Sequence, residues 1–149
     1  MSVKHFIFHP GTWIGEGNIS FSSSPKKIHF YTKWIVGEEG PSGIYCEQQV
    51  EMQGGHDRLY NRVVFSKIVN GSFVIQLANE AIENGTGEGI YNEQNLAWEF
   101  PAQTSQLEDS HFEGFEIYTL KSDLTYEIHA EYSSGDAFKT IIDGRLWKK

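Results

Sequence analysis

The segment Ile28-His29-Phe30-Tyr31-Thr32-Lys33-Trp34-Ile35-Val36 alternates between two sets of side chains. In an extended chain, one face would carry Ile28, Phe30, Thr32, Trp34 and Val36, and the other His29, Tyr31, Lys33 and Ile35. A period of two residues is typical of a β-strand with one buried face, whereas a helix repeats every 3.6 residues. The alternation therefore predicts a strand over 28–36.

The same alternation recurs along the whole chain of 149 residues. Strands are predicted over 13–21, 28–36, 44–52, 59–66, 73–77, 87–91, 96–100, 112–120, 124–132 and 138–147. Short segments rich in Gly, Asn, Ser and Asp separate them and favour tight turns. Only 77–84 could hold a turn of helix, which is too short for the crossover that parallel strands need. The length and the pattern indicate one all-β, antiparallel domain over 1–149.

About ten consecutive antiparallel strands would leave two exposed edges in an open sheet, and such edges promote aggregation. Closing the sheet removes both edges. We therefore expect a single up-and-down β-barrel. A β-sandwich or jelly roll is the alternative, since strand spacing alone does not distinguish a Greek-key order.

Composition excludes several classes of function. The 20 acidic residues outnumber the 12 basic ones and give a net charge of −8, which opposes binding to nucleic acid or an anionic membrane surface. No run of about 18 apolar residues is present, so no membrane-spanning helix is expected. The N-terminal residues do not form a secretory signal, and the single Cys46 excludes an internal disulfide or a cysteine cluster for a metal. These features suit a cytoplasmic protein.

Two short motifs lie at the ends of the chain: Pro10-Gly11-Thr12-Trp13-Ile14-Gly15-Glu16-Gly17 and Asp143-Gly144-Arg145-Leu146-Trp147. Together they resemble the calycin superfamily, which includes lipocalins and fatty-acid-binding proteins. In that group a Gly-x-Trp at the first strand packs against an Arg or Lys of the last strand. The resemblance implies that Gly11, Trp13 and Arg145 close one end of the barrel. A guanidinium stacked on an indole would contribute about 0.5 to 2 kcal/mol.

The first motif is most similar to the nitrobindin-like branch of ten-stranded barrels, which bind haem through a histidine near the C-terminus. The last histidine here is His129, and none follows it. We therefore expect no haem. The six histidines show no metal-ligand spacing such as His-x-His, so no metal site is expected either.

Polar residues on apolar faces mark a candidate ligand site. Gln48 and Asn61 share faces with aliphatic residues, and buried amides need a hydrogen-bonding partner, a water molecule or a ligand. Aromatic residues are expected to line the same interior. The predicted ligand-binding residues are Trp34, Gln48, Asn61, Phe65, Trp98, Tyr118 and Tyr126. We expect them to enclose a small, partly apolar or aromatic molecule, unless the rings fill the barrel themselves.

Two other functions remain open. The barrel could be an isomerase, lyase or hydrolase that uses Glu116, His129 or Tyr118 as an acid or base, although no Gly-x-Ser-x-Gly motif is present and binding without catalysis is favoured. Alternatively, a filled barrel could present an acidic outer face to a basic partner, through Glu47, Glu51, Glu127 and Glu131. The sequence leaves a homodimer open as well.

Overall fold

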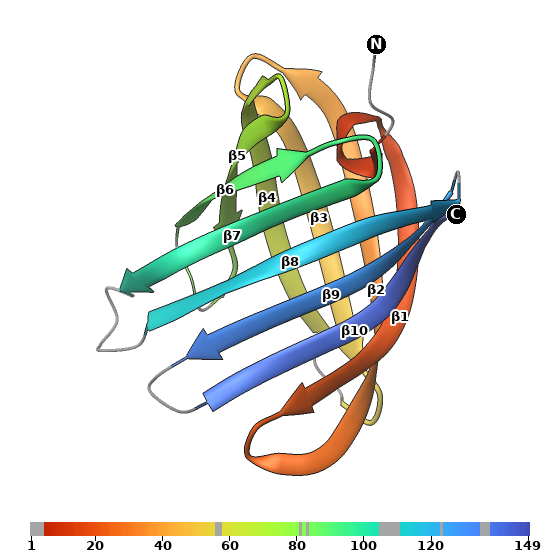
Figure 1. Ribbon diagram of the computed structural model, residues 1–149, viewed down its shortest axis with the longest axis vertical. Coiled ribbons are helices and arrows are strands. Elements are labelled where there is room, and N and C mark those ends of the chain that lie inside the picture. Colours follow the sequence, from red (N-terminus) through yellow and green to blue (C-terminus); the bar gives the residue numbers. More distant parts are fainter. Residues whose placement is uncertain are drawn as a thin grey trace.

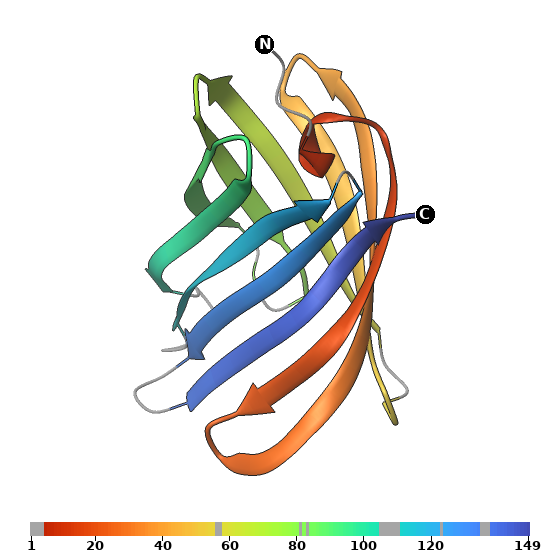
Figure 2. The same cartoon turned by 45° about the vertical axis from the view of Figure 1, so that its right-hand side comes forward.

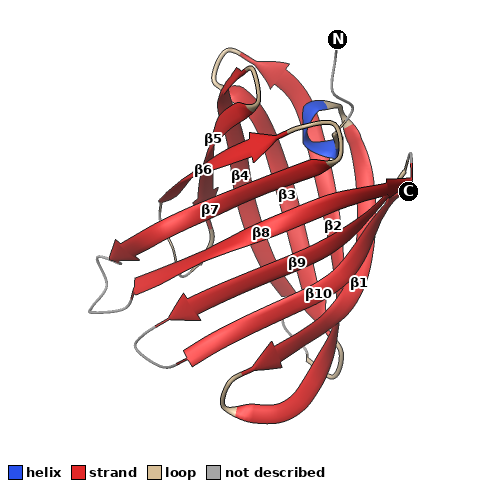
Figure 3. Cartoon of the chain, viewed as in Figure 1, coloured by secondary structure: helices blue, strands red, loops and turns tan. Residues whose placement is uncertain are grey.

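The computed structural model describes residues 5–55, 58–80, 82, 84–104, 111–122, 124–134 and 138–149. It contains ten strands and one short 3-10 helix, η1 (Phe6–Phe8), shown in Figure 3. The strands are β1 (Gly11–Phe21), β2 (Ser24–Gly40), β3 (Gly43–Met52), β4 (Arg58–Val69), β5 (Ser72–Ala78), β6 (Gly85–Tyr91), β7 (Asn95–Thr104), β8 (His111–Ser122), β9 (Thr125–Ser134) and β10 (Phe138–Lys148). Each predicted strand is present, and most extend beyond the predicted range.

The sheet closes on itself. Every strand pairs antiparallel with its neighbours in the chain, and β1 pairs with β10 from Trp13 opposite Lys148 to Phe21 opposite Thr140. Figures 1 and 2 show this order, with β7 to β10 crossing one side of the barrel and β2 to β5 the other. The prediction of an up-and-down barrel is confirmed, and the sandwich alternative is wrong.

Helix η1 seals one end of the barrel, beside the start of β1 (Figure 3). The ring centroid of Phe6 lies 5.4 to 5.6 Å from those of Trp13, Trp34, Tyr118 and Tyr126. Further buried rings, including Phe65 and Phe73, continue this packing. We call this part of the interior the packed half. A helix of three residues leaves no periodic signal, and the sequence did not predict it.

Two hydrogen bonds of His5, to Tyr126 and to the Asn92 backbone, hold η1 against the barrel. Its Nε2 lies 2.6 Å from the Asn92 carbonyl oxygen, which can only accept, so Nε2 carries the proton. Its Nδ1 therefore accepts from the Tyr126 hydroxyl at 2.9 Å, and that hydroxyl in turn accepts from the Phe6 amide. Burial lowers the pKa of His5, which favours this neutral form.

Barrel closure differs from the expectation in one residue. Trp13 is buried at the sealed end, but Arg145 is exposed and lies over the ring of Trp147 instead. The Nζ of Lys148 lies 5.8 Å from the centroid of the Trp13 ring, and a Cβ at Gly11 would approach that Nζ to 2.3 Å. Arg145 is opposite Glu16 and faces outward. Lys148 is opposite Trp13, so Lys148 and not Arg145 is the basic residue that contacts this ring.

Candidate ligand-binding site

Beyond the packed half, the barrel contains a cavity of about 380 Å³. Its wall is mostly aliphatic and aromatic, with side chains such as Phe30, Val63, Leu77, Ile128 and Ile142. Met52 and Leu59, which are partly exposed, also line it, so the cavity reaches the surface away from η1. We call this part of the interior the hollow half.

A chain of polar side chains crosses one wall of the cavity, from β2 to the end of β5. Gln48 donates to the Thr32 hydroxyl at 3.2 Å, and Asn61 donates to Gln48 Oε1 at 2.9 Å. Asn79 donates to Asn61 Oδ1 at 3.0 Å and accepts from the Ile82 amide. Gln48 and Asn61 are directly opposite each other on β3 and β4, so the sheet register sets this contact.

Gln48 and Asn61 are hydrogen-bonding partners of each other, as buried amides require. The two residues form a paired cross-strand contact, and both line the cavity. Each amide nitrogen carries two hydrogens and each amide oxygen has two lone pairs. At Gln48 and Asn61, the hydrogen bonds among the described residues use one hydrogen of each amide nitrogen and one lone pair of each amide oxygen.

A carboxyl group borders the cavity on β8. Tyr118 donates to Glu116 Oε1 at 2.7 Å, and Tyr132 from β9 donates to Glu116 Oε2. Burial raises the pKa of Glu116, although the hydrogen bonds from Tyr132, Tyr118 and the Trp98 indole oppose this effect. The pKa values of both phenols lie well above their usual value, chiefly because of burial.

The structure separates the predicted binding residues into two groups. Trp34, Gln48, Asn61, Trp98 and Tyr118 line the cavity. Phe65 and Tyr126 lie in the packed half, where both are fully buried and neither borders the cavity. The sequence prediction omitted Thr32, Asn79 and Tyr132, which complete the two polar groups.

Trp34 lies between the two halves. Its Nε1 is the only buried side-chain nitrogen or oxygen without a hydrogen-bond partner among the described residues. The indole N–H lowers the pKa of the Tyr118 hydroxyl, so it lies near that oxygen but without hydrogen-bonding geometry. A buried donor without a partner is unfavourable by about 1–3 kcal/mol, so an acceptor from a bound molecule would stabilise it.

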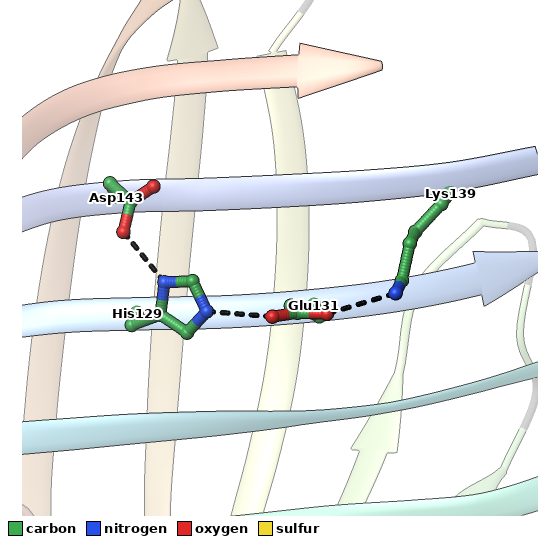
Figure 4. Close-up of polar contacts among 4 residues, drawn as sticks. All are labelled: His129, Glu131, Lys139 and Asp143. Atoms are coloured by element: carbon green, nitrogen blue, oxygen red, sulfur yellow. Dashed lines mark hydrogen bonds and ion pairs between the residues drawn. The ribbon is translucent and has the colours of Figure 1, made fainter. Parts of the chain in front are cut away.

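His129 lies on the outer face of β9, away from the cavity. Figure 4 shows its ring between two carboxylates, with Nδ1 2.6 Å from Asp143 and Nε2 2.9 Å from Glu131. Asp143 is the main cause of its raised pKa. Glu131 also forms an ion pair with Lys139 at 3.1 Å (Figure 4). Because it faces outward, His129 cannot act on a molecule inside the barrel.

Basic side chains form ion pairs with several glutamates of the acidic outer face. Besides Glu131, Glu51 pairs with Arg58 at 3.5 Å and Glu127 with Lys121 at 3.3 Å. Glu47 is exposed. In the described part of the chain, no three His, Cys, Asp or Glu side chains form a metal site. Burial raises the pKa of Cys46 to about 12, so its thiol stays protonated.

In its fold the chain is similar to EF1p2_mFAP2b, whose structure is known bound to DFHBI. The two are 14% identical, with 94% of this chain and 93% of the other aligned, at a TM-score of 0.50. At this identity the likeness concerns the fold alone. No family model and no curated protein matches the chain. Among the described residues, no helix has the length and hydrophobicity to span a membrane.

Proposed function

We propose that the protein binds a small, partly apolar molecule inside the hollow half of the barrel. The observation that carries this proposal is the cavity of about 380 Å³ with its apolar wall and two inward-facing polar groups. Known ligand pockets occupy roughly 300–1,000 Å³ and combine these same features. The binding residues would be Trp34, Gln48, Asn61, Trp98 and Tyr118, together with Thr32, Asn79, Glu116 and Tyr132.

Affinity would come mainly from the apolar area that ligand and wall remove from water, at about 25 cal/mol per Å². The amides of Gln48 and Asn61 would orient polar atoms of the ligand, because hydrogen bonds already hold both groups in place. Groups fixed before binding lose little conformational entropy when the ligand arrives.

The structural comparison also supports the proposal. EF1p2_mFAP2b, which has the same overall fold, is known bound to DFHBI. The contact between Trp13 and Lys148 also supports a calycin relationship, since an Arg or Lys of the last strand is expected there.

Filling the cavity tests the proposal. The probe is N-phenyl-1-naphthylamine, an apolar molecule whose fluorescence rises when it leaves water. Ala130 is buried and lines the cavity, so Ala130→Phe should abolish the fluorescence increase with little loss of stability. The matched control is Ala97→Phe, because Ala97 pairs with the exposed Ile117 on the outer face of the barrel. Equal probe binding by wild type and Ala130→Phe would contradict the proposal.

A second candidate function is acid–base catalysis in the same cavity. Glu116 favours it, since a buried carboxyl with a raised pKa is typical of catalytic acids and bases. Tyr118 would be the second proton-transfer group, through its hydrogen bond to Glu116.

Metabolite profiling distinguishes catalysis from binding. The protein is incubated with a small-molecule extract, and the extract is analysed by mass spectrometry. A binder removes at most one molecule per protein chain, and the molecule is recovered unchanged on denaturation. An enzyme converts many molecules per chain into a product, and Glu116→Gln should stop the conversion. Conversion that persists in Glu116→Gln would exclude this residue as the acid or base.

A further inference from the structure

The charges around the cavity are of one sign. Among the described residues that line it, Glu116 is the only one with a carboxyl group, and none is Lys, Arg or His. The whole chain adds a net charge of −8. An anionic ligand, such as a fatty acid, would find no cationic partner in the described wall and would be repelled by the field of the protein.

The hydrogen-bond directions at Glu116 are equally one-sided. Both phenol hydrogens point at its carboxyl, and the Trp98 indole lies close enough to affect its pKa. The donors of the cluster are therefore directed inward at Glu116. Each carboxylate oxygen has a further lone pair, and a group that presents N–H donors complements it, whereas a second acceptor at the same place does not. The Trp34 indole N–H, which has no partner among the described residues, would suit an acceptor elsewhere on the same molecule.

Aromatic rings surround this acceptor cluster. The rings of Trp98 and Tyr118 are stacked at a tilt with centroids 5.0 Å apart, and Trp34 lies 6.1 Å from Trp98. Phe100 borders the same cavity. Aromatic faces attract cations, and the attraction is stronger where water is excluded.

From these features we infer that the ligand is an organic amine, with its ammonium group beside Glu116 and its apolar body against the aliphatic wall. This inference rests on the proposed binding function and specifies the chemical class of the ligand. The amides of Gln48 and Asn61 would contact polar atoms at another part of the molecule.

Glu116 is only partly exposed in the free protein, so part of the desolvation of its carboxyl is already complete before a ligand binds. An ammonium that enters beside it gains a charged hydrogen bond, and its own dehydration is the main opposing term. Where Glu116 holds a proton before binding, that proton passes to solvent as the ammonium arrives. The product is an ion pair of a carboxylate and an ammonium, with no covalent change.

Three probes with one ring system and different charges test the inference: 1-naphthylmethylamine, 1-naphthylmethanol and 1-naphthoate. Calorimetric titration near pH 7 measures their affinities for the wild-type protein. The amine is a cation at this pH and should bind at least about tenfold more tightly than the alcohol, since hydrogen bonds between charged groups are worth about 1.5–3 kcal/mol. The naphthoate anion should bind most weakly.

Glu116→Gln keeps the shape of the side chain and removes its charge. The variant should bind the amine and the alcohol with similar affinity. Glu47→Gln is the matched control, because it makes the same change in net charge at an exposed position on β3 and should keep the amine preference.

A pH series on the wild-type protein gives an independent test that holds even if Glu116→Gln does not fold. The ratio of amine to alcohol affinity should rise with pH across the raised pKa of Glu116, as the carboxyl ionises. Tyr118 and Tyr132, the described titratable groups that face Glu116, stay protonated, because burial raises their pKa values well above the ordinary phenol value.

The outcomes separate the two proposals. Equal affinity for all three probes, or tightest binding of naphthoate, would overturn the amine inference and leave the binding function intact. A ratio of amine to alcohol affinity that does not change with pH would overturn it as well. If none of the probes binds, the proposed binding function fails, and the inference fails with it.

Discussion

The packed and hollow halves of the barrel are built from the same strands but differ in the size of their inward side chains. Along β4 the inward residue shrinks from Phe65 through Val63 to Asn61, and along β9 from Tyr126 through Ile128 to Ala130. Strands β3 and β4 pair without a register shift through both halves, from Ile44 opposite Phe65 to Glu51 opposite Arg58. Closure of a barrel therefore does not decide whether its interior is filled.

The two halves also satisfy their polar groups differently. In the packed half, His5 and Tyr126 bond to each other and to backbone groups of Phe6 and Asn92. In the hollow half, the amides and Glu116 bond to their neighbours and still face open space. The first arrangement stabilises the fold, whereas the second is suited to an additional partner.

Truncating one phenylalanine in each half should give the largest contrast in stability. Phe65→Ala removes a ring that contacts Trp34, Phe73 and Trp98, and should lower the free energy of unfolding by about 3–5 kcal/mol. Phe30→Ala should have a smaller effect, because the Phe30 ring already borders a cavity and has fewer packing contacts to lose. Urea denaturation measures both values. Equal losses would mean that the two halves are packed alike.

A glycine in β6 gives the next largest effect. A Cβ at Gly89 would lie 2.0 Å from Cζ of Phe73, so Gly89→Ala must displace this buried ring. The substitution should lower the free energy of unfolding by about 1–3 kcal/mol. At Gly40 the nearest atom to a new Cβ is 3.9 Å away, and Gly40→Ala should change stability by less than about 0.5 kcal/mol. Thermal unfolding compares the two. A Gly89→Ala protein as stable as wild type would show that the packed half can rearrange.

The buried histidine predicts a pH dependence of smaller size. Burial lowers the pKa of His5, so below about pH 6.5 the unfolded chain binds a proton at this residue more readily than the folded protein does. The free energy of unfolding should therefore decrease as pH falls through this range. In His5→Gln the decrease should be shallower. Urea denaturation at several pH values checks this, and identical slopes for the two proteins would contradict a neutral, buried His5.

The exposed histidine predicts the smallest effect, with the opposite sign. The pKa of His129 is raised, mainly by its hydrogen bond to Asp143. Its stabilising contribution is complete below about pH 6.5 and disappears as pH rises through the raised pKa. The His129 side chain is well exposed, so His129→Asn should lower the free energy of unfolding by only about 0–1 kcal/mol at low pH. The same denaturation series measures it, and a loss that grows with pH would refute the ion-pair assignment.

The sequence was sufficient for the fold because most strands alternate clearly. The 28–36 segment, for example, has Trp34 inside and Tyr31 outside, as its pattern indicated. It was not sufficient for the register of the last strand, where Arg145 and Lys148 are both basic and only the pairing with β1 shows which one meets Trp13.

The candidate site was only partly predictable for a similar reason. Gln48 and Asn61 interrupt apolar faces, and this identified them. Glu116 and His129 were both candidate acids or bases, and strand β8 has apolar residues on both faces, with Tyr118 inside and Ile117 outside. The sequence therefore did not decide that Glu116, and not His129, borders the cavity. The depth of the packed half also depends on η1, which places Phe6 against distant strands.

A crystal structure of the protein with N-phenyl-1-naphthylamine tests the central claim most directly. We predict density for the probe in the hollow half, between the aliphatic wall and the cluster of Glu116, Tyr118 and Tyr132, with the packed half unchanged. A hollow half that is closed by its own side chains, or a probe bound on the outer face of the barrel, would contradict the account.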